Sequence, residues 1–400
     1  MERLQNNEEL SIRNIDFHKI IYYNSKIMTQ SIRLDVNREV FSWAVARAGF
    51  APNDVLSKYP KFLQWTSGET FATVKQLKDF SQKFHFPFGY FFLNDIPHAE
   101  HLIPFFRASE EESARENLYI QELTSILSER QDWVSEYLRE NDAGKNPAVG
   151  LYTKENNAKK IKSGILDFLG LEDTWQSKLK NPEQAIKKMI SLLEANNVFV
   201  TFSSVVNFDT HRPIPVKLCR GFCLIDDFAP FIFVNSSDSK NAQLFTLAHE
   251  LAHIFISFSA GFGDFGAEEI TNDREKLCDK VAAEFLVPEY LLLEKSKSST
   301  DEELCAFFKV SNIVILRRKL DCGLISRDIF FKEYNKLSAY KRSGGSGGDF
   351  YKSARNRIGE KFIRCLSNAI IERKITPLEA YRLAGVNGNV FTKLAHGVQS

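Results

Sequence analysis

The sequence predicts an α+β protein that is predominantly α-helical, with one small sheet flanked by small helical domains. Amphipathic stretches with apolar residues at helical spacing recur along most of the 400 residues. Three strand-like apolar runs lie between residues 198 and 235. A chain of this length exceeds the usual size of one domain, so about two to four domains are expected.

The composition is that of an ordinary globular protein. Lys and Arg (52) balance Asp and Glu (51), and the formal charge of +1 excludes a globally basic nucleic-acid coat and an acidic disordered chain. Six scattered cysteines without a CxxC pair predict reduced thiols rather than a disulfide scaffold. No secretory signal opens the chain and no run of about 18 apolar residues occurs, so we expect a soluble, cytoplasmic protein without a membrane partner.

The first part of the chain is expected to form short helices. A helical stretch from Glu39 ends at Gly49, a short segment spans 52–59, and 71–84 has the apolar spacing of an amphipathic helix. Several short helices in one small region are typical of a helix-turn-helix domain.

The middle of the chain combines helices and strands. A long helix at 116–138 precedes a polar, linker-like stretch at 140–147. Further helices are expected at 158–169 and 182–195, and strands at 198–202, 221–225 and 231–235. The last two strands are separated by five residues, which predicts a hairpin.

Helices dominate again after the hairpin. Helical periodicity covers 241–258 and 271–286, with a Gly-containing loop at 261–266 between them and Pro288 as the stop. A helix pair follows at 301–308 and 311–320. The run Ser-Gly-Gly-Ser-Gly-Gly at 343–348 is a flexible stretch before a helical C-terminal region.

The motif His249-Glu250-Leu251-Ala252-His253 lies in an apolar, helix-compatible stretch. The spacing i, i+4 places both imidazoles on one helix face, where they can bind one zinc ion. Glu250 points away from the ligand pair and can act on a zinc-bound water. The alternative is a chance match, in which two core histidines bond to backbone carbonyls.

A catalytic zinc site needs a third protein ligand and an open position. Glu275 is the preferred ligand and Glu269 the alternative, while Asp279 could accept the second N–H of a ligating histidine. Other acidic candidates are Glu268, Asp273 and Glu284. The sequence therefore predicts one Zn²⁺ per chain and a zincin-like core, a small sheet with an HExxH helix.

This set of candidate ligands and the candidate base predicts metal-assisted hydrolysis of a peptide bond. Zinc would polarise the scissile carbonyl, and Glu250 would take a proton from water and pass it to the leaving amine. The strand that contains Phe231, Phe233 and Asn235 could pair with an extended substrate. His211 and Tyr290 are weak candidates for stabilising the oxyanion.

Several segments resemble the ImmA/IrrE family of zinc-dependent metallo-endopeptidases. The resemblance rests on Asn235, on Phe245-Thr246-Leu247-Ala248-His249-Glu250-Leu251-Ala252-His253 and on Glu275-x-x-Cys278-Asp279 with Ala282-Ala283-Glu284-Phe285-Leu286-Val287-Pro288. Cys278 stands where Ala is typical, and we expect it in the core. The resemblance implies that His249, His253 and Glu275 are the ligands and Glu250 the base.

The resemblance extends to both ends of the chain. Val36-Asn37-x-Glu39-Val40, Trp65-x-Ser67-Gly68-Glu69 and Gly89-Tyr90-Phe91-Phe92-Leu93 resemble the XRE-like helix-turn-helix unit of many members. Gly347-Gly348-Asp349-Phe350-Tyr351 and Glu379-Ala380-Tyr381-Arg382-Leu383-Ala384-Gly385-Val386 are similar to the ending of longer members. We expect an extension (1–27), a degenerate XRE-like helix-turn-helix domain (28–100), a helical connector (101–150), the metallopeptidase domain (151–292), a helix-turn-helix-like segment (293–342), and a Gly-rich linker with a basic helical region (343–400).

Charge argues against sequence-specific DNA binding by residues 28–100, where 8 Lys or Arg face 7 Asp or Glu. Residues 341–400 hold 11 Lys or Arg and 4 Asp or Glu; these cations lie on solvated helix faces or, alternatively, form a docking surface for nucleic acid or an acidic partner.

The family implies a bacterial or phage protein in the cytoplasm, in a stress-response or mobile-element system. Its partner would be a protein substrate, namely a DNA-binding transcriptional repressor, or the product of a neighbouring gene, and DNA binding by the chain itself is the further possibility. The alternative function is a non-catalytic regulatory or antitoxin-like binding protein of a two-gene locus. A structural zinc would be closed by four protein ligands and would not need Glu250.

Overall fold

The computed structural model describes residues 33–48, 50, 52–84, 86, 88–93, 95, 114–257, 268–338 and 350–399. The chain divides into two compact units, Met1–His98 and Ala99–Ser400. The extension expected at 1–27, the Gly-containing loop at 261–266 and the Gly-rich stretch at 343–348 lie outside the described residues.

The first unit is helical, as the sequence predicts. Its elements are α2 (Glu39–Arg47), α3 (Pro52–Lys58), α4 (Phe62–Ser67), α5 (Val74–Lys83) and the 3₁₀ helix η1 (Phe88–Phe92). The helix expected at 71–84 starts later because Thr73 forms a capping box with Gln76. Aromatic rings fill the core, with the Phe41 ring centroid 5.1 Å from that of Phe80 and 4.9 Å from that of Phe91.

The second unit is built around a three-stranded sheet of order β1-β3-β2. Strand β1 (Phe199–Ser203) runs parallel to β3 (Phe231–Asn235), and β2 (Gly221–Leu224) runs antiparallel to it. The β2–β3 hairpin is confirmed. Nearly all strand residues are buried, so the sheet is covered on both faces.

One face of the sheet is covered by α8 (Pro182–Ala195) and α9 (Lys240–Ile256), and α7 (Ala158–Leu169) and α10 (Glu268–Leu286) pack on α9. Ile232 and Val234 of β3 point into this hydrophobic cluster. Short helices extend it, namely α11 (Glu289–Lys295), α12 (Asp301–Phe308), α13 (Asn312–Asp321) and α14 (Arg327–Ser338).

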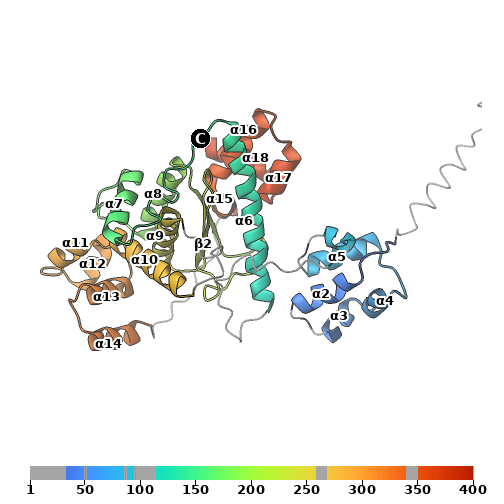
Figure 1. The fold of residues 1–400 in the computed structure, drawn as a ribbon, viewed down its shortest axis with the longest axis horizontal. Helices are drawn as coiled ribbons and strands as arrows, with labels where there is room; N and C mark the ends of the chain where they lie inside the picture. Colours follow the sequence, from blue (N-terminus) through green and yellow to red (C-terminus); the bar gives the residue numbers. More distant parts are fainter. Residues whose placement is uncertain are drawn as a thin grey trace, which may run out of the picture. The chain divides into compact units, whose positions relative to one another are not determined.

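The other face is covered by α6 (Ala114–Glu140) and by the C-terminal helices (Figure 1). These are α15 (Phe350–Ile358), α16 (Glu360–Ile371), α17 (Pro377–Ala384) and α18 (Gly388–Gln399). Phe231 and Phe233 point into this second cluster, opposite to Ile232 and Val234, as the two-residue period of a strand requires. Helices that are far apart in the sequence therefore cover the same face of the sheet.

Local capping explains where helices begin and end. The bounds of α7 and α8 agree with the expected 158–169 and 182–195, because Asn157 and Asn181 cap their first turns and Gly170 ends α7 in the left-handed region. The long helix is longer than expected at both ends, and α9 begins at Lys240 because Ser239 caps it.

The stretch at 140–147, expected as a linker, is mostly exposed and has no regular secondary structure after Glu140, but it is anchored at Asn146. Asn146 is buried; its backbone N–H donates to Asp227 O (2.6 Å) and its side-chain amide donates to Asn196 O (2.8 Å). The polar side chains of this stretch also bond to other parts of the unit, as Lys145 does to the carboxylate of Asp227. No helix of the described residues is long and apolar enough to cross a membrane.

Candidate metal centre and active site

Helix α9 positions the two histidines of the motif. Ser239 accepts a hydrogen bond from Ala242 N at the start of α9, and the helix is buried between the sheet and α10. His249 and His253 lie one turn apart on one face, with side chains 16% and 1% exposed. Both imidazoles are therefore held on the same helix face and are largely shielded from solvent.

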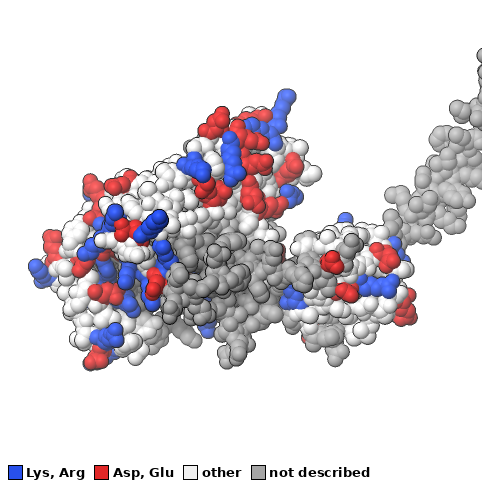
Figure 2. All heavy atoms as spheres, in the orientation of Figure 1, with Lys and Arg blue, Asp and Glu red and all other residues white. Residues whose placement is uncertain are grey.

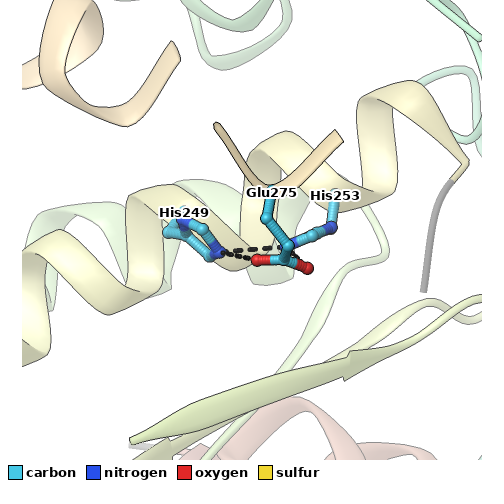
Figure 3. A group of neighbouring side chains, drawn as sticks. All are labelled: His249, His253 and Glu275. Carbon is cyan, nitrogen blue, oxygen red and sulfur yellow. Dashed lines mark hydrogen bonds and ion pairs between the residues drawn. The ribbon is translucent and has the colours of Figure 1, made fainter. Parts of the chain in front are cut away.

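Glu275 of α10 joins the two histidines (Figure 3). The Nε2 atoms of His249 and His253 are 2.9 Å apart. Glu275 places Oε2 3.3 Å from His249 Nε2 and Oε1 3.4 Å from His253 Nε2. The structure thus brings together the three residues that the sequence predicts as ligands.

Asp279 lies one turn after Glu275 and reaches the other ring nitrogen of His249, with Nδ1 and Oδ1 3.0 Å apart. Burial alone would lower the pKa of His249, but the hydrogen bonds of Asp279 and Glu275 outweigh it and raise the pKa to about 10. Burial raises the pKa of Glu275, yet the two histidines lower it to about 2. Asp279 thus fixes which nitrogen of His249 faces Glu275.

The three ligand atoms fit a zinc ion. They lie within 4.8 Å of one another. Two ligand atoms bound to a tetrahedral zinc lie roughly 3.3 Å apart, which is close to the spacings from Glu275 to the histidines. A His₂Glu donor set is one of those that hold catalytic zinc, and it leaves a fourth position open. His249, His253 and Glu275 would therefore hold the metal.

Glu250 is buried beside this cluster. Burial raises the pKa of its carboxyl group, while the neighbouring His253 and His249 lower it. The Cys223 thiol of β2 forms a side-chain hydrogen bond with Glu250. A carboxylate with a raised pKa, held next to a metal site, suits a general base.

Strand β2, and not β3, is the sheet edge beside Glu250. A Cβ added at Gly221 would lie 3.4 Å from Glu250 Oε1. The prediction that Phe231, Phe233 and Asn235 form a substrate strand is wrong, because β3 is paired on both sides. Phe231 and Phe233 are buried in the cluster on the opposite face, and the Asn235 amide donates to Ile214 O and Cys219 O, 2.9 Å each.

The remaining candidates have other roles. Glu284 is buried and bound by Arg318, and Asp273 is exposed and pairs with Lys276. His211 is exposed, and the hydroxyl of Tyr290 donates to Asp173 (2.8 Å). The side chains of Glu268 and Glu269 are outside the described residues.

Cys278 is fully buried in the core, as expected. Burial and the carboxylates of Glu275 and Glu250 raise the pKa of its thiol. Cys278 is not a member of the metal-ligand group His249, His253 and Glu275. The proximity of Gly221 and Cys223 to Glu250 was not predicted, because it depends on how β2 lies across α9 and no local spacing encodes it.

A groove of about 2080 Å³ starts beside Asp279 and is lined by residues of α9, α10, α13 and α14. Its wall includes Thr246, which lies against Gly221. The charged lining is mixed, and Figure 2 shows Lys and Arg interspersed with Asp and Glu on the face of the unit that carries α13 and α14. The groove shares Asp279 with the metal site, but its lining does not include the three ligands or Glu250, and it has no strong charge preference.

Comparison with known proteins agrees with this geometry. Residues 196–319 match the family model Peptidase_M78, described as an IrrE N-terminal-like domain. The matched segment contains the whole sheet, α9 with both histidines and α10 with Glu275. No curated protein matched the chain. The match supports a metallopeptidase-type function for the matched segment and agrees with the family resemblance seen in the sequence.

Proposed function

We propose that this chain is a zinc-dependent endopeptidase that hydrolyses a peptide bond in a specific protein partner. The observation that carries the proposal is the convergence of His249, His253 and Glu275 on one point, with Glu250 buried beside them. A structural zinc would need a fourth protein ligand, and the metal-ligand group of the described residues has three members.

Zinc bound there would supply a Lewis acid for the scissile carbonyl and for a water molecule. Glu250 accepts the proton of the attacking water and passes it to the leaving amine. The raised pKa of Glu250 favours the first transfer, because the conjugate base of a less acidic carboxyl group takes a proton from water more readily. Asp279 orients His249, and Cys223 holds Glu250 against β2.

The substrate chain would pair with β2. Asn235 N donates to Arg220 O (2.8 Å), so alternate residues from Arg220 onward direct their backbone groups toward β3. The N–H and C=O groups of Gly221 and Cys223 then face the other edge, on which no strand pairs within the described residues. An extended peptide added there would pass Glu250, and the groove beside Asp279 would receive its continuation.

The partner class rests on the family resemblance. We propose a DNA-binding transcriptional repressor as the substrate, in a bacterial or phage stress-response or mobile-element system in the cytoplasm. Cleavage of the repressor would switch on its genes.

The experiment compares wild type with Glu250→Gln. Metal analysis of both proteins is followed by co-expression of each with the product of the neighbouring gene. One zinc in both and cleavage of the partner by the wild type alone is the expected result. Stable partner binding without cleavage in either would favour a non-catalytic, antitoxin-like binding protein, and absence of metal from both would overturn the site.

A further inference from the structure

Two helix pairs in the second unit follow the same local plan. Each first helix, α12 or α17, has 8 residues and starts with a capping box between a Thr and the Glu three residues later. Each ends at a residue with positive φ, Lys309 (56°) or Gly385 (72°). The second helix then starts three residues later, where Ser311 Oγ accepts from Val314 N (3.4 Å) and Asn387 Oδ1 accepts from Val390 N (3.0 Å).

This plan is that of a helix-turn-helix, in which a short helix and a tight turn place a second helix across the first. In the C-terminal pair the apolar face is complete, with Ala380, Ala384, Phe391 and Leu394 all buried. Helix α16 packs against both α17 and α18 as the third helix. The pair is therefore a closed three-helix arrangement, with one face of α18 left for solvent.

The two pairs differ in what their second helix exposes. In α13, Arg318 is buried against Glu284 and Val287 O, and Ile313 and Arg317 line the groove beside the metal site. This helix is thus used within the peptidase unit. In α18 the exposed residues are Asn389, Thr392, Lys393 and His396, which share one face at spacings of three and four.

Charge separates the two pairs as well. Residues 301–338 hold 7 Lys or Arg and 6 Asp or Glu, a balance of +1. Residues 350–399 hold 9 Lys or Arg and 3 Asp or Glu, a balance of +6. Some of these cations bind within the unit, such as Arg382 to Glu129 and Arg364 to Glu194. Arg355 of α15 donates to Gly397 O of α18, and the ammonium of Lys393, within α18, lies 5.5 Å from the Tyr351 ring centroid.

We propose that α17 and α18 form a binding site for double-stranded DNA, with α18 as the recognition helix in the major groove. Asn and Lys side chains are suited to adenine and guanine edges, and Thr and Lys to phosphates. The exposed, described side chains of α18 include no large apolar one, although Leu378 of α17 is 76% exposed; protein-binding helices present aromatic or aliphatic anchors. The chemistry of this face therefore favours nucleic acid over a protein partner.

The proposal can be tested by fluorescence anisotropy. The full chain is titrated against a labelled, mixed-sequence DNA duplex of about 30 base pairs, at salt concentrations from about 50 to 200 mM. The wild type should bind, and its affinity should fall steeply with salt. Lys393→Gln should weaken binding and lower the slope of log affinity against log salt by about 1. Lys178→Gln, which removes an exposed lysine outside the C-terminal helices, should bind like the wild type.

Selection from a randomised duplex library adds a second readout. The wild type should enrich a short site, and Asn389→Ala should lose roughly tenfold in affinity for it and relax the preference at one base pair. Glu250→Gln should bind duplex like the wild type, so loss of the proposed peptidase activity would leave this result unchanged.

Two results would overturn the proposal. The first is the absence of duplex binding by the wild type at low salt, or duplex binding by Lys393→Gln and Asn389→Ala with the affinity and salt slope of the wild type. The other is a wild type that binds a neighbouring-gene protein instead of DNA and loses it on Lys393→Gln, which would make α18 a protein-contact helix.

Discussion

Replacing Glu194 by Gln should stabilise the protein above neutral pH. Glu194 ends α8 beneath α16, and its carboxylate is 5% exposed, with Arg364 3.7 Å away. Burial raises its pKa from 4.5 to about 7, although the Lys361 backbone N–H and Arg364 act in the opposite direction. The folded protein therefore keeps a proton on Glu194 that the unfolded chain releases.

The sign and size of the effect on stability follow from the difference in the pKa of Glu194 between the folded and the unfolded chain. Between pH 4.5 and about 7 the folded state binds more protons, so stability falls as pH rises through this window and levels off above it. The full shift corresponds to about 3 kcal/mol. Roughly 2 kcal/mol of this loss should occur between pH 5 and pH 8.

Urea unfolding at a series of pH values measures the effect. The free energy of unfolding of Glu194→Gln should exceed that of the wild type by an amount that grows toward pH 8, because the amide stays neutral. Glu136→Gln, at an exposed position of α6, should show the wild-type pH dependence. Equal pH dependence in Glu194→Gln and wild type would refute the reasoning.

Three further predictions concern the metal site and its neighbours. Zinc at about 100 times its Kd should stabilise EDTA-treated wild type by about 2.7 kcal/mol in thermal unfolding, and a His253→Ala variant should not respond. Asp279→Asn should weaken zinc binding by roughly 10- to 100-fold in a competition titration, whereas Asp273→Asn, whose side chain is 79% exposed, should not. Gly221→Ala should lose about 1–3 kcal/mol in urea unfolding, because the added methyl would meet Phe233 O at 2.8 Å. No atom lies within 4 Å of a Cβ at Gly89, so Gly89→Ala should unfold like wild type.

The local parts of the structure were predictable from the sequence. Asn157 and Asn181 mark the starts of α7 and α8, since a cap acts on its own first turn. The candidate ligands come from two helices close in sequence, and His249 and His253 share a face by spacing alone.

Non-local features were not predictable. Strand β3 is central because β1 joins it from an earlier part of the chain, and a fully buried strand has no alternation that reveals its neighbours. The contact of Cys223 with Glu250 depends on the same pairing.

The two-sided burial of the sheet bears on how the chain can be divided. The family match ends at residue 319, yet Phe199, Phe231 and Phe233 of the sheet are covered by α6 and by the helices after residue 350. A fragment cut to the matched segment would expose these rings to water and lose the covering of a whole sheet face. The matched segment is therefore not expected to fold by itself, and a chain that lacks its last 50 residues should aggregate rather than remain a soluble protein with an intact metal site.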